Sequence, residues 1–186
     1  MLGERLGHPF DKPLKSIAKK IPLTPNTITV TGFLVTAVAG VILSGDLLLG
    51  GVMVLAGGFF DILDGVVARA NGTSSRFGAF LDSVLDRYSD AFILLGIGWN
   101  LFHRSNLTGV VLCLGTLVGA FLISYSRARA EGIGEDCRNG LLERPERVIL
   151  ISFGAITGFI VPVLWVLVIF THFTVLQRVY HVWRLT

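Results

Sequence analysis

The most informative stretch of the sequence is DILDGVVARANGTSSRFGAFLDSVLDRYSD (61–90), in which five aspartates lie within 30 residues. Apolar runs flank it on both sides, LLLGGVMVLAGGFF (47–60) and AFILLGIGWNLF (91–102). The whole chain is 52% hydrophobic and 16% charged, whereas soluble domains carry about 25% charged residues. This composition indicates an integral membrane protein, and ionisable groups at membrane depth are by default a sign of function.

The apolar runs outside this stretch define the remaining helices. A spanning helix needs about 20 mostly apolar residues, and the uncharged runs 28–45 and 105–126 reach that length alone. The two runs beside the aspartates reach it only by including them, which predicts helices at 47–70 and 74–102. The intervening NGTSS (71–75) suits a chain break followed by an N-cap. Gly158 and Pro162 divide the last run into helices near 145–159 and 161–183.

These segments predict an all-α integral membrane protein with six transmembrane helices in one domain, 1–186. With six spans, the side that holds both termini receives fifteen of the 16 Lys and Arg residues, and the other side receives only Arg104. The positive-inside rule therefore predicts a multi-pass cell-membrane protein with cytoplasmic termini and a cytoplasmic active site. The apolar and lysine residues of PFDKPLKSIAKKIPL (9–23) predict an amphipathic interfacial helix in a juxtamembrane segment, 1–23, before the six-helix bundle, 24–186.

The aspartates are spaced so that each helix presents an acidic face. Asp61 and Asp64 are three residues apart, and Asp82, Asp86 and Asp90 are four apart, so each set shares one side of its helix. Facing carboxylates repel one another unless cations lie between them, and hard oxygen ligands select Mg²⁺, Mn²⁺ or Ca²⁺. Carboxylates shared by two metal ions are typical of displacement at phosphorus. The hairpin therefore predicts a two-metal phosphoryl-transfer site.

Other residues of the stretch fit the same chemistry. Gly65 and Gly78 leave room for a ligand to approach the backbone closely, and Arg69 is placed to meet a phosphate. An alternative is that Asp–Arg pairs, with Arg69 and Arg87 as partners, only hold the hairpin together.

The order Asp61-x-x-Asp64-Gly65-x-x-Ala68-Arg69, then eight intervening residues, then Gly78-x-x-x-Asp82-x-x-x-Asp86, resembles the full signature of the CDP-alcohol phosphotransferases. The resemblance implies transfer of a phospho-alcohol group from a CDP-alcohol to a hydroxyl, with release of CMP. It also implies two Mg²⁺ ions, or Mn²⁺, and a homodimer. The implied metal ligands are Asp61, Asp64, Asp82 and Asp86, with Asp86 also the general base. The implied CDP-alcohol pocket consists of Thr24, Pro25, Asn26, Thr27, Gly65, Arg69, Ser75 and Gly78. Asp90 lies outside the signature, and we expect it to have a structural role.

A second cluster, SYSRARAEGIGEDCRNGLLERPERVIL (124–150), is rich in arginine on the same predicted side. Arginine forks suit a second phosphate, carried by the acceptor. The segment resembles phosphatidylinositol phosphate synthases and their archaetidylinositol phosphate counterparts, although some members have Lys in place of Arg127. That resemblance implies CDP-diacylglycerol as donor and inositol 1-phosphate as acceptor. The implied acceptor-phosphate residues are Arg127, Arg144 and Arg147, with Arg178 as a further candidate.

Other functions remain open at this stage. Glycerol 3-phosphate also carries a phosphate, and CDP-inositol would be an alternative donor. Intramembrane aspartates also suit a divalent-cation transporter, although the acids gather near one face rather than across the bilayer. A purely structural role would make the complete signature a coincidence. The net charge of +3 does not indicate a nucleic-acid partner.

Overall fold

The computed structural model describes residues 23–137 and 139–185, which form six helices. These are α2 (Pro25–Leu43), α3 (Leu47–Asn71), α4 (Arg76–His103), α5 (Leu107–Glu131), α6 (Arg144–Thr157) and α7 (Ile160–Leu185). The six helices predicted from the apolar runs are confirmed to within a few residues at each end. The predicted interfacial helix at 9–23, within the juxtamembrane segment 1–23, lies outside the described residues except for its last one.

Local sequence explains where the helices begin and end. Thr24, Asp46, Ser75 and Asn106 cap α2 to α5, and each side chain accepts a hydrogen bond from the backbone N–H three residues on. The predicted break at NGTSS is confirmed, because α3 ends at Asn71 and Ser75 caps α4. Gly72 and Gly158 follow α3 and α6 with φ of 64° and 79°, a left-handed conformation that favours glycine.

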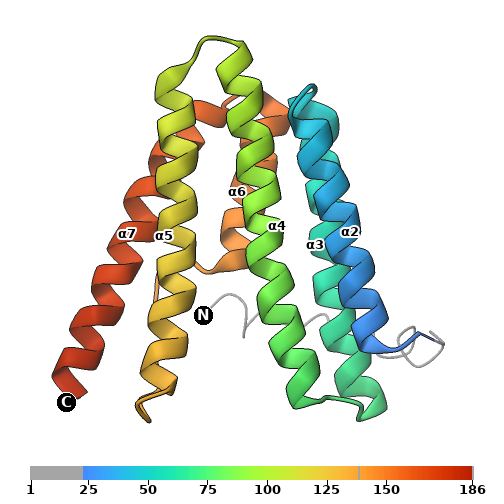
Figure 1. The fold of residues 1–186 in the computed structure, drawn as a ribbon, viewed down its shortest axis with the longest axis vertical. Coiled ribbons are helices and arrows are strands. Elements are labelled where there is room, and N and C mark those ends of the chain that lie inside the picture. Colours follow the sequence, from blue (N-terminus) through green and yellow to red (C-terminus); the bar gives the residue numbers. More distant parts are fainter. Residues whose placement is uncertain (1–22, 138, 186) are drawn as a thin grey trace.

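The six helices pack into one bundle (Figure 1). Helix α2 packs against α3 and α4, α5 packs against α4 and α7, and α6 bridges α3 and α7. The turn between α3 and α4 lies at the same end of the bundle as the end of α5 and the C-terminal end of α7 (Figure 1). The acidic hairpin and the arginine-rich loop therefore open on one end of the molecule, as the charge distribution predicted.

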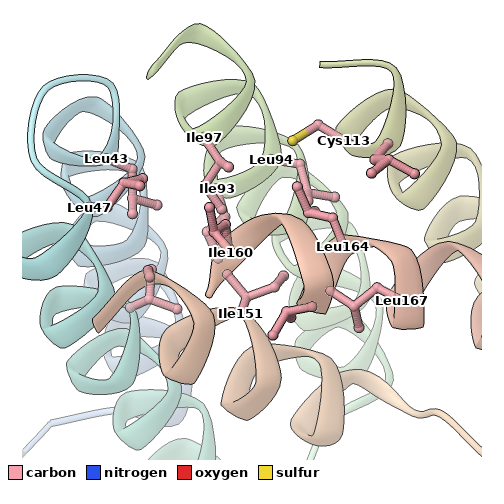
Figure 2. Close-up of a cluster of buried hydrophobic side chains, with 14 of the residues drawn as sticks. Leu43, Leu47, Ile93, Leu94, Ile97, Cys113, Ile151, Ile160, Leu164 and Leu167 are labelled. Atoms are coloured by element: carbon pink, nitrogen blue, oxygen red, sulfur yellow. The ribbon is translucent and has the colours of Figure 1, made fainter. Parts of the chain in front are cut away.

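All six helices contribute to one buried core (Figure 2). Close backbone contact supports it, because a Cβ added at Gly96 of α4 would lie 2.0 Å from the carbonyl oxygen of Gly40 in α2. Outward-facing side chains of the bundle include many large exposed hydrophobic residues, such as Val111 and Leu176, both 66% exposed. An apolar surface of this kind suits contact with lipid.

Four helices, α2, α3, α5 and α7, are long and apolar enough to cross a membrane by length and composition. Helix α6 has 14 residues, so at about 1.5 Å per residue it is shorter than the ~30 Å hydrocarbon core. Helix α4 has the length, but its first 15 residues carry three aspartates and two arginines. The expectation of a membrane all-α protein is supported, while the count of six spans stays a prediction.

Candidate functional site

The acidic faces of α3 and α4 lie toward the end of the bundle where their connecting turn is found. Asp64 is buried at 7% exposure, and its Oδ2 accepts a hydrogen bond of 2.6 Å from Thr29 Oγ1 in α2. The same hydroxyl lies 3.0 Å from the carbonyl oxygen of Pro25. Thr29 thus orients the carboxylate, a role the sequence analysis missed. The sequence did offer a signal for Thr29: it lies one helical turn after Pro25 and Asn26, which were already assigned to the site.

Arg144 of α6 lies among the aspartates. Its Nη1 donates to Asp61 and lies 2.7 Å from Asp86 Oδ1, while its Nε is 3.8 Å from Asp90 Oδ1. The sequence analysis placed Arg144 at the acceptor phosphate and Asp61 and Asp86 on metal ions, whereas this structure pairs the three with one another. The physical reason is that partly buried carboxylates are unfavourable without a nearby positive charge, and Arg144 supplies it.

Asp90 and Arg147 form a second, deeper pair. Arg147 Nη2 donates to Asp90 Oδ2 at 2.6 Å, and the two residues are 3% and 6% exposed. This pair links α4 to α6 and agrees with a structural role for Asp90. Arg87, considered above as an ion-pair partner, instead donates to the backbone carbonyl of Ser83 on its own helix.

A first cavity, of about 180 Å³, lies between the start of α2, the end of α3 and the start of α4. A Cβ added at Gly78 would lie 2.9 Å from Asn26 Oδ1, and one added at Gly65 would lie 3.1 Å from an Arg69 nitrogen, so both glycines make close packing possible. Predicted CDP-alcohol residues in its lining are Pro25, Asn26, Gly65, Arg69, Ser75 and Gly78. The hydroxyls of Thr24 and Thr27 hydrogen-bond each other at 2.8 Å at the start of α2, and neither residue lines this cavity.

A second cavity, of about 530 Å³, is walled by α4, α5, α6 and α7. Arg178 is 3% exposed, and its guanidinium donates to the backbone carbonyls of Asn139, at 2.9 Å, and Ile123. Arg127 pairs with Glu131 at 2.9 Å on the more exposed side. All the predicted acceptor-phosphate residues line this cavity: Arg127, Arg144, Arg147 and the further candidate Arg178.

A third cavity, of about 470 Å³, lies between α3 and α6 and is mostly apolar. Leu55, Phe59 and Ile149 contribute to its wall, and Asp61 and Arg144 stand at its polar end. Asp82 borders all three cavities, and Asp86 borders the second and third. The carboxylates predicted for catalysis therefore lie where a polar pocket, a cationic pocket and an apolar groove meet.

The donor set of the site is suited to hard divalent cations, because the only ionisable ligands that α3 and α4 bring to it are carboxylates. Within residues 23–137 and 139–185, however, no group of three His, Cys, Asp or Glu side chains is close enough to hold a metal ion. The arginine contacts of Asp61 and Asp86 and the Thr29 contact of Asp64 occupy oxygens that would serve as ligands. Arg144 and Thr29 thus contact three of the four predicted metal ligands in this structure.

Known proteins similar in sequence to this chain identify its family. Residues 22–183 match the family model described as CDP-alcohol phosphatidyltransferase. The chain is 41% identical to an archaetidylinositol phosphate synthase of Methanothermobacter thermautotrophicus, over 90% of this chain and 87% of the other. It is 39% identical to a phosphatidylinositol phosphate synthase of Mycobacteroides abscessus, over 91% and 82%.

Solved structures of a similar enzyme superpose closely. Phosphatidylinositol phosphate synthase of Mycobacterium tuberculosis with CDP-DAG bound has a TM-score of 0.82 at 33% identity, covering 96% of this chain and 94% of that one. The same enzyme in complex with manganese and citrate has a TM-score of 0.81 at 33% identity, covering 95% and 88%. By sequence and by fold, this chain belongs to the CDP-alcohol phosphatidyltransferase family.

Proposed function

We propose that the protein transfers the phosphatidyl group of CDP-diacylglycerol to a hydroxyl of inositol 1-phosphate and releases CMP. The observation that carries this proposal is the position of Asp82 at the junction of three cavities of different chemistry. A CDP-lipid has a polar nucleotide and an apolar tail joined at a diphosphate, and the acceptor brings a second phosphate. One polar, one apolar and one arginine-lined space meeting at carboxylates match these three parts.

The donor nucleotide fits the first cavity. Its diphosphate would lie toward Asp64 and Asp82, with Arg69 contributing positive charge on the cavity wall. The lipid tail would leave through the groove between α3 and α6, whose wall is mostly apolar. Thr24 caps α2 by hydrogen bonds to Thr27, and these two residues act by holding Pro25 and Asn26 in the cavity wall.

The acceptor phosphate fits the second cavity, where Arg127, Arg144, Arg147 and Arg178 approach from three helices. Arginine binds phosphate with parallel hydrogen bonds, which also fixes the orientation of the ligand. Arg178 is suited to this role because its guanidinium donates hydrogen bonds to two backbone carbonyls, which are neutral and do not offset its positive charge. A phosphorylated polyol held there presents its hydroxyl toward Asp86, which lines the same cavity.

Asp61, Asp64, Asp82 and Asp86 are the residues that would hold two Mg²⁺ ions, or Mn²⁺. When bound, such ions neutralise the diphosphate and stabilise the leaving CMP. In this structure the guanidinium of Arg144 contacts Asp61 and Asp86, and Arg144 also lines the second cavity. The same arginine can therefore serve the acceptor phosphate.

The reaction itself needs few protein groups. The acceptor hydroxyl oxygen forms a bond to the phosphorus that carries the diacylglycerol, and the bond from that phosphorus to the CMP oxygen breaks. Asp86 is placed to accept the hydroxyl proton, the role of a general base. The aspartates and arginines otherwise position the two substrates for in-line attack.

Membrane placement follows from the same proposal. All six helices cross the bilayer of the cell membrane, with both termini and the site on the cytoplasmic side. The buried Asp90–Arg147 pair allows the charged α4 and the short α6 to lie inside the bundle without unpaired charge at that level. The functional unit is a homodimer.

The proposal is tested with purified protein in liposomes that contain CDP-diacylglycerol. Labelled inositol 1-phosphate, glycerol 3-phosphate, free inositol and serine are supplied separately, and CDP-inositol replaces the donor in a parallel series. We expect a lipid product and CMP with inositol 1-phosphate, complete loss with EDTA, and recovery with Mg²⁺ or Mn²⁺. Preferential use of glycerol 3-phosphate or CDP-inositol would overturn the substrate assignment. Cation flux without CMP formation would favour a transporter.

A further inference from the structure

The loop between α5 and α6, described at residues 132–137 and 139–143, contacts one face of α7 through a histidine. His181 Nε2 lies 3.2 Å from the backbone oxygen of Asp136, and His181 Nδ1 lies 3.0 Å from Asn139 Nδ2. Asp136 lies 45 positions before His181 in the sequence, and Asn139 lies 42 positions before it. Both ring nitrogens of one side chain are thus used to hold this loop.

Arg178 holds the same loop one turn earlier on α7. Its Nε donates to the backbone oxygen of Asn139 at 2.9 Å, so Asn139 is fastened by both its side chain and its backbone. A Cβ added at Gly140 would lie 2.7 Å from Thr174 Cγ2, which shows how closely the loop lies on α7. Thr174, Arg178 and His181 are spaced by four and three residues, so they share one helix face.

The position of this loop affects the arginine-lined cavity at two points. Arg178 is anchored to the loop and lines the cavity, and the loop continues through buried Leu142, 7% exposed, into the first turn of α6. That turn carries Arg144 and Arg147. A displaced loop would therefore move three of the four arginines proposed for the acceptor phosphate.

We infer that His181 is a positioning residue for acceptor binding, acting through Asn139 and the loop on Arg178 and the start of α6; this inference rests on the proposed function. The amide of Asn139 needs an acceptor and the carbonyl of Asp136 needs a donor, and the neutral imidazole offers one of each. Glutamine also carries one acceptor and donor groups, whereas leucine carries neither. The chemistry of the pair therefore predicts which substitutions preserve the contact.

The kinetic test compares His181→Leu, His181→Gln and the wild type. We expect His181→Leu to raise the KM for the acceptor by about tenfold, the loss of one or two hydrogen bonds, with kcat and the donor KM unchanged. His181→Gln is expected to retain most of the wild-type acceptor KM. His172→Leu is the matched control on α7, because His172 Nδ1 contacts the Val168 carbonyl of its own helix. An unchanged acceptor KM in His181→Leu, or no rescue by glutamine, would overturn the inference.

A second measurement follows the loop directly. Cys137 lies in the loop and is 0% exposed, and burial raises the pKa of its thiol, so it should react slowly with maleimide. Cys113→Ala leaves Cys137 as the only thiol, and in that background His181→Leu should accelerate alkylation while His181→Gln should not. Equal rates would overturn the inference.

The two measurements separate the inference from the proposed function. If the wild type uses a different phosphorylated acceptor, the same KM comparison is made with that acceptor. If it transfers to no phosphorylated acceptor, the proposed function fails and the role in acceptor binding fails with it, even where the alkylation rates show that His181 holds the loop. If the wild type uses inositol 1-phosphate and His181→Leu changes neither measurement, only the inference fails.

Discussion

The carboxylate site of α2, α3 and α4 differs in construction from the arginine-lined cavity beside it. The first cavity is built from residues 25–82, three consecutive helices joined by short turns. The second takes residues from four helices spread over positions 79–178. Local spacing therefore places the carboxylates, whereas long-range packing places the arginines. This difference predicts that substitutions in the two regions change different measured quantities.

The largest effect should come from Asp86→Asn. Removing the proposed general base should lower kcat by roughly 10²- to 10⁴-fold. Donor binding should be retained, because the nucleotide cavity does not include Asp86 and asparagine has nearly the same shape where Asp86 borders the apolar groove. Turnover and binding of the labelled donor are measured on the same preparation. Asp46→Asn is the control, since Asn also caps helices well and Asp46 serves as the N-cap of α3. Substantial turnover by Asp86→Asn would remove the base from the mechanism.

Asp90→Ala tests the connection between the two regions. It leaves the guanidinium of Arg147 buried beside α4 without its 2.6 Å partner, and breaking a buried pair on one side costs about 3–5 kcal/mol. We expect a marked drop in the thermal unfolding midpoint in detergent. The double variant Asp90→Leu with Arg147→Leu should recover much of that loss, because no buried charge then remains unpaired. Equal stability of Asp90→Ala and wild type would show that the pair is not a structural link.

Arg144→Ala tests whether this arginine binds the acceptor phosphate. Hydrogen bonds to a charged group contribute about 1.5–3 kcal/mol, so the KM for the acceptor should rise roughly 10- to 100-fold. The donor KM should change less than the acceptor KM, since Arg144 does not line the nucleotide cavity and only borders the polar end of the apolar groove. Arg104→Ala, at the opposite end of the bundle, provides the control. If the acceptor dependence is unchanged, Arg144 serves the aspartates alone and the division between the two regions fails.

The smallest effect concerns the packing of the carboxylate half. A Cβ at Gly96 would meet the Gly40 carbonyl at 2.0 Å, so Gly96→Ala must separate α2 from α4 and should cost about 1–3 kcal/mol. At Gly98 the nearest atom would be at 3.6 Å, an ordinary contact, so Gly98→Ala is the matched control. Thermal unfolding of the two variants should differ. Identical midpoints would indicate that this close helix crossing contributes little.

Much of the fold could be predicted because helix signals are local. Apolar runs, capping residues and the glycines at 72 and 158 specify where each helix begins and ends, and the structure confirms these limits. The four-residue spacing of Asp82, Asp86 and Asp90 likewise determines that they share a helix face, because helix geometry is the same in any protein. The sequence alone therefore determined the helices and the acidic face of each.

Contacts between distant residues were decided only by the tertiary structure. The pairing of Arg144 with Asp61 spans 83 positions, that of Arg147 with Asp90 spans 57, and that of Thr29 with Asp64 spans 35. No spacing rule predicts these contacts, because they depend on how the side chains of whole helices pack. Arg144 lies among the aspartates because partly buried carboxylates need a positive charge, and only the folded chain determines which arginine supplies it.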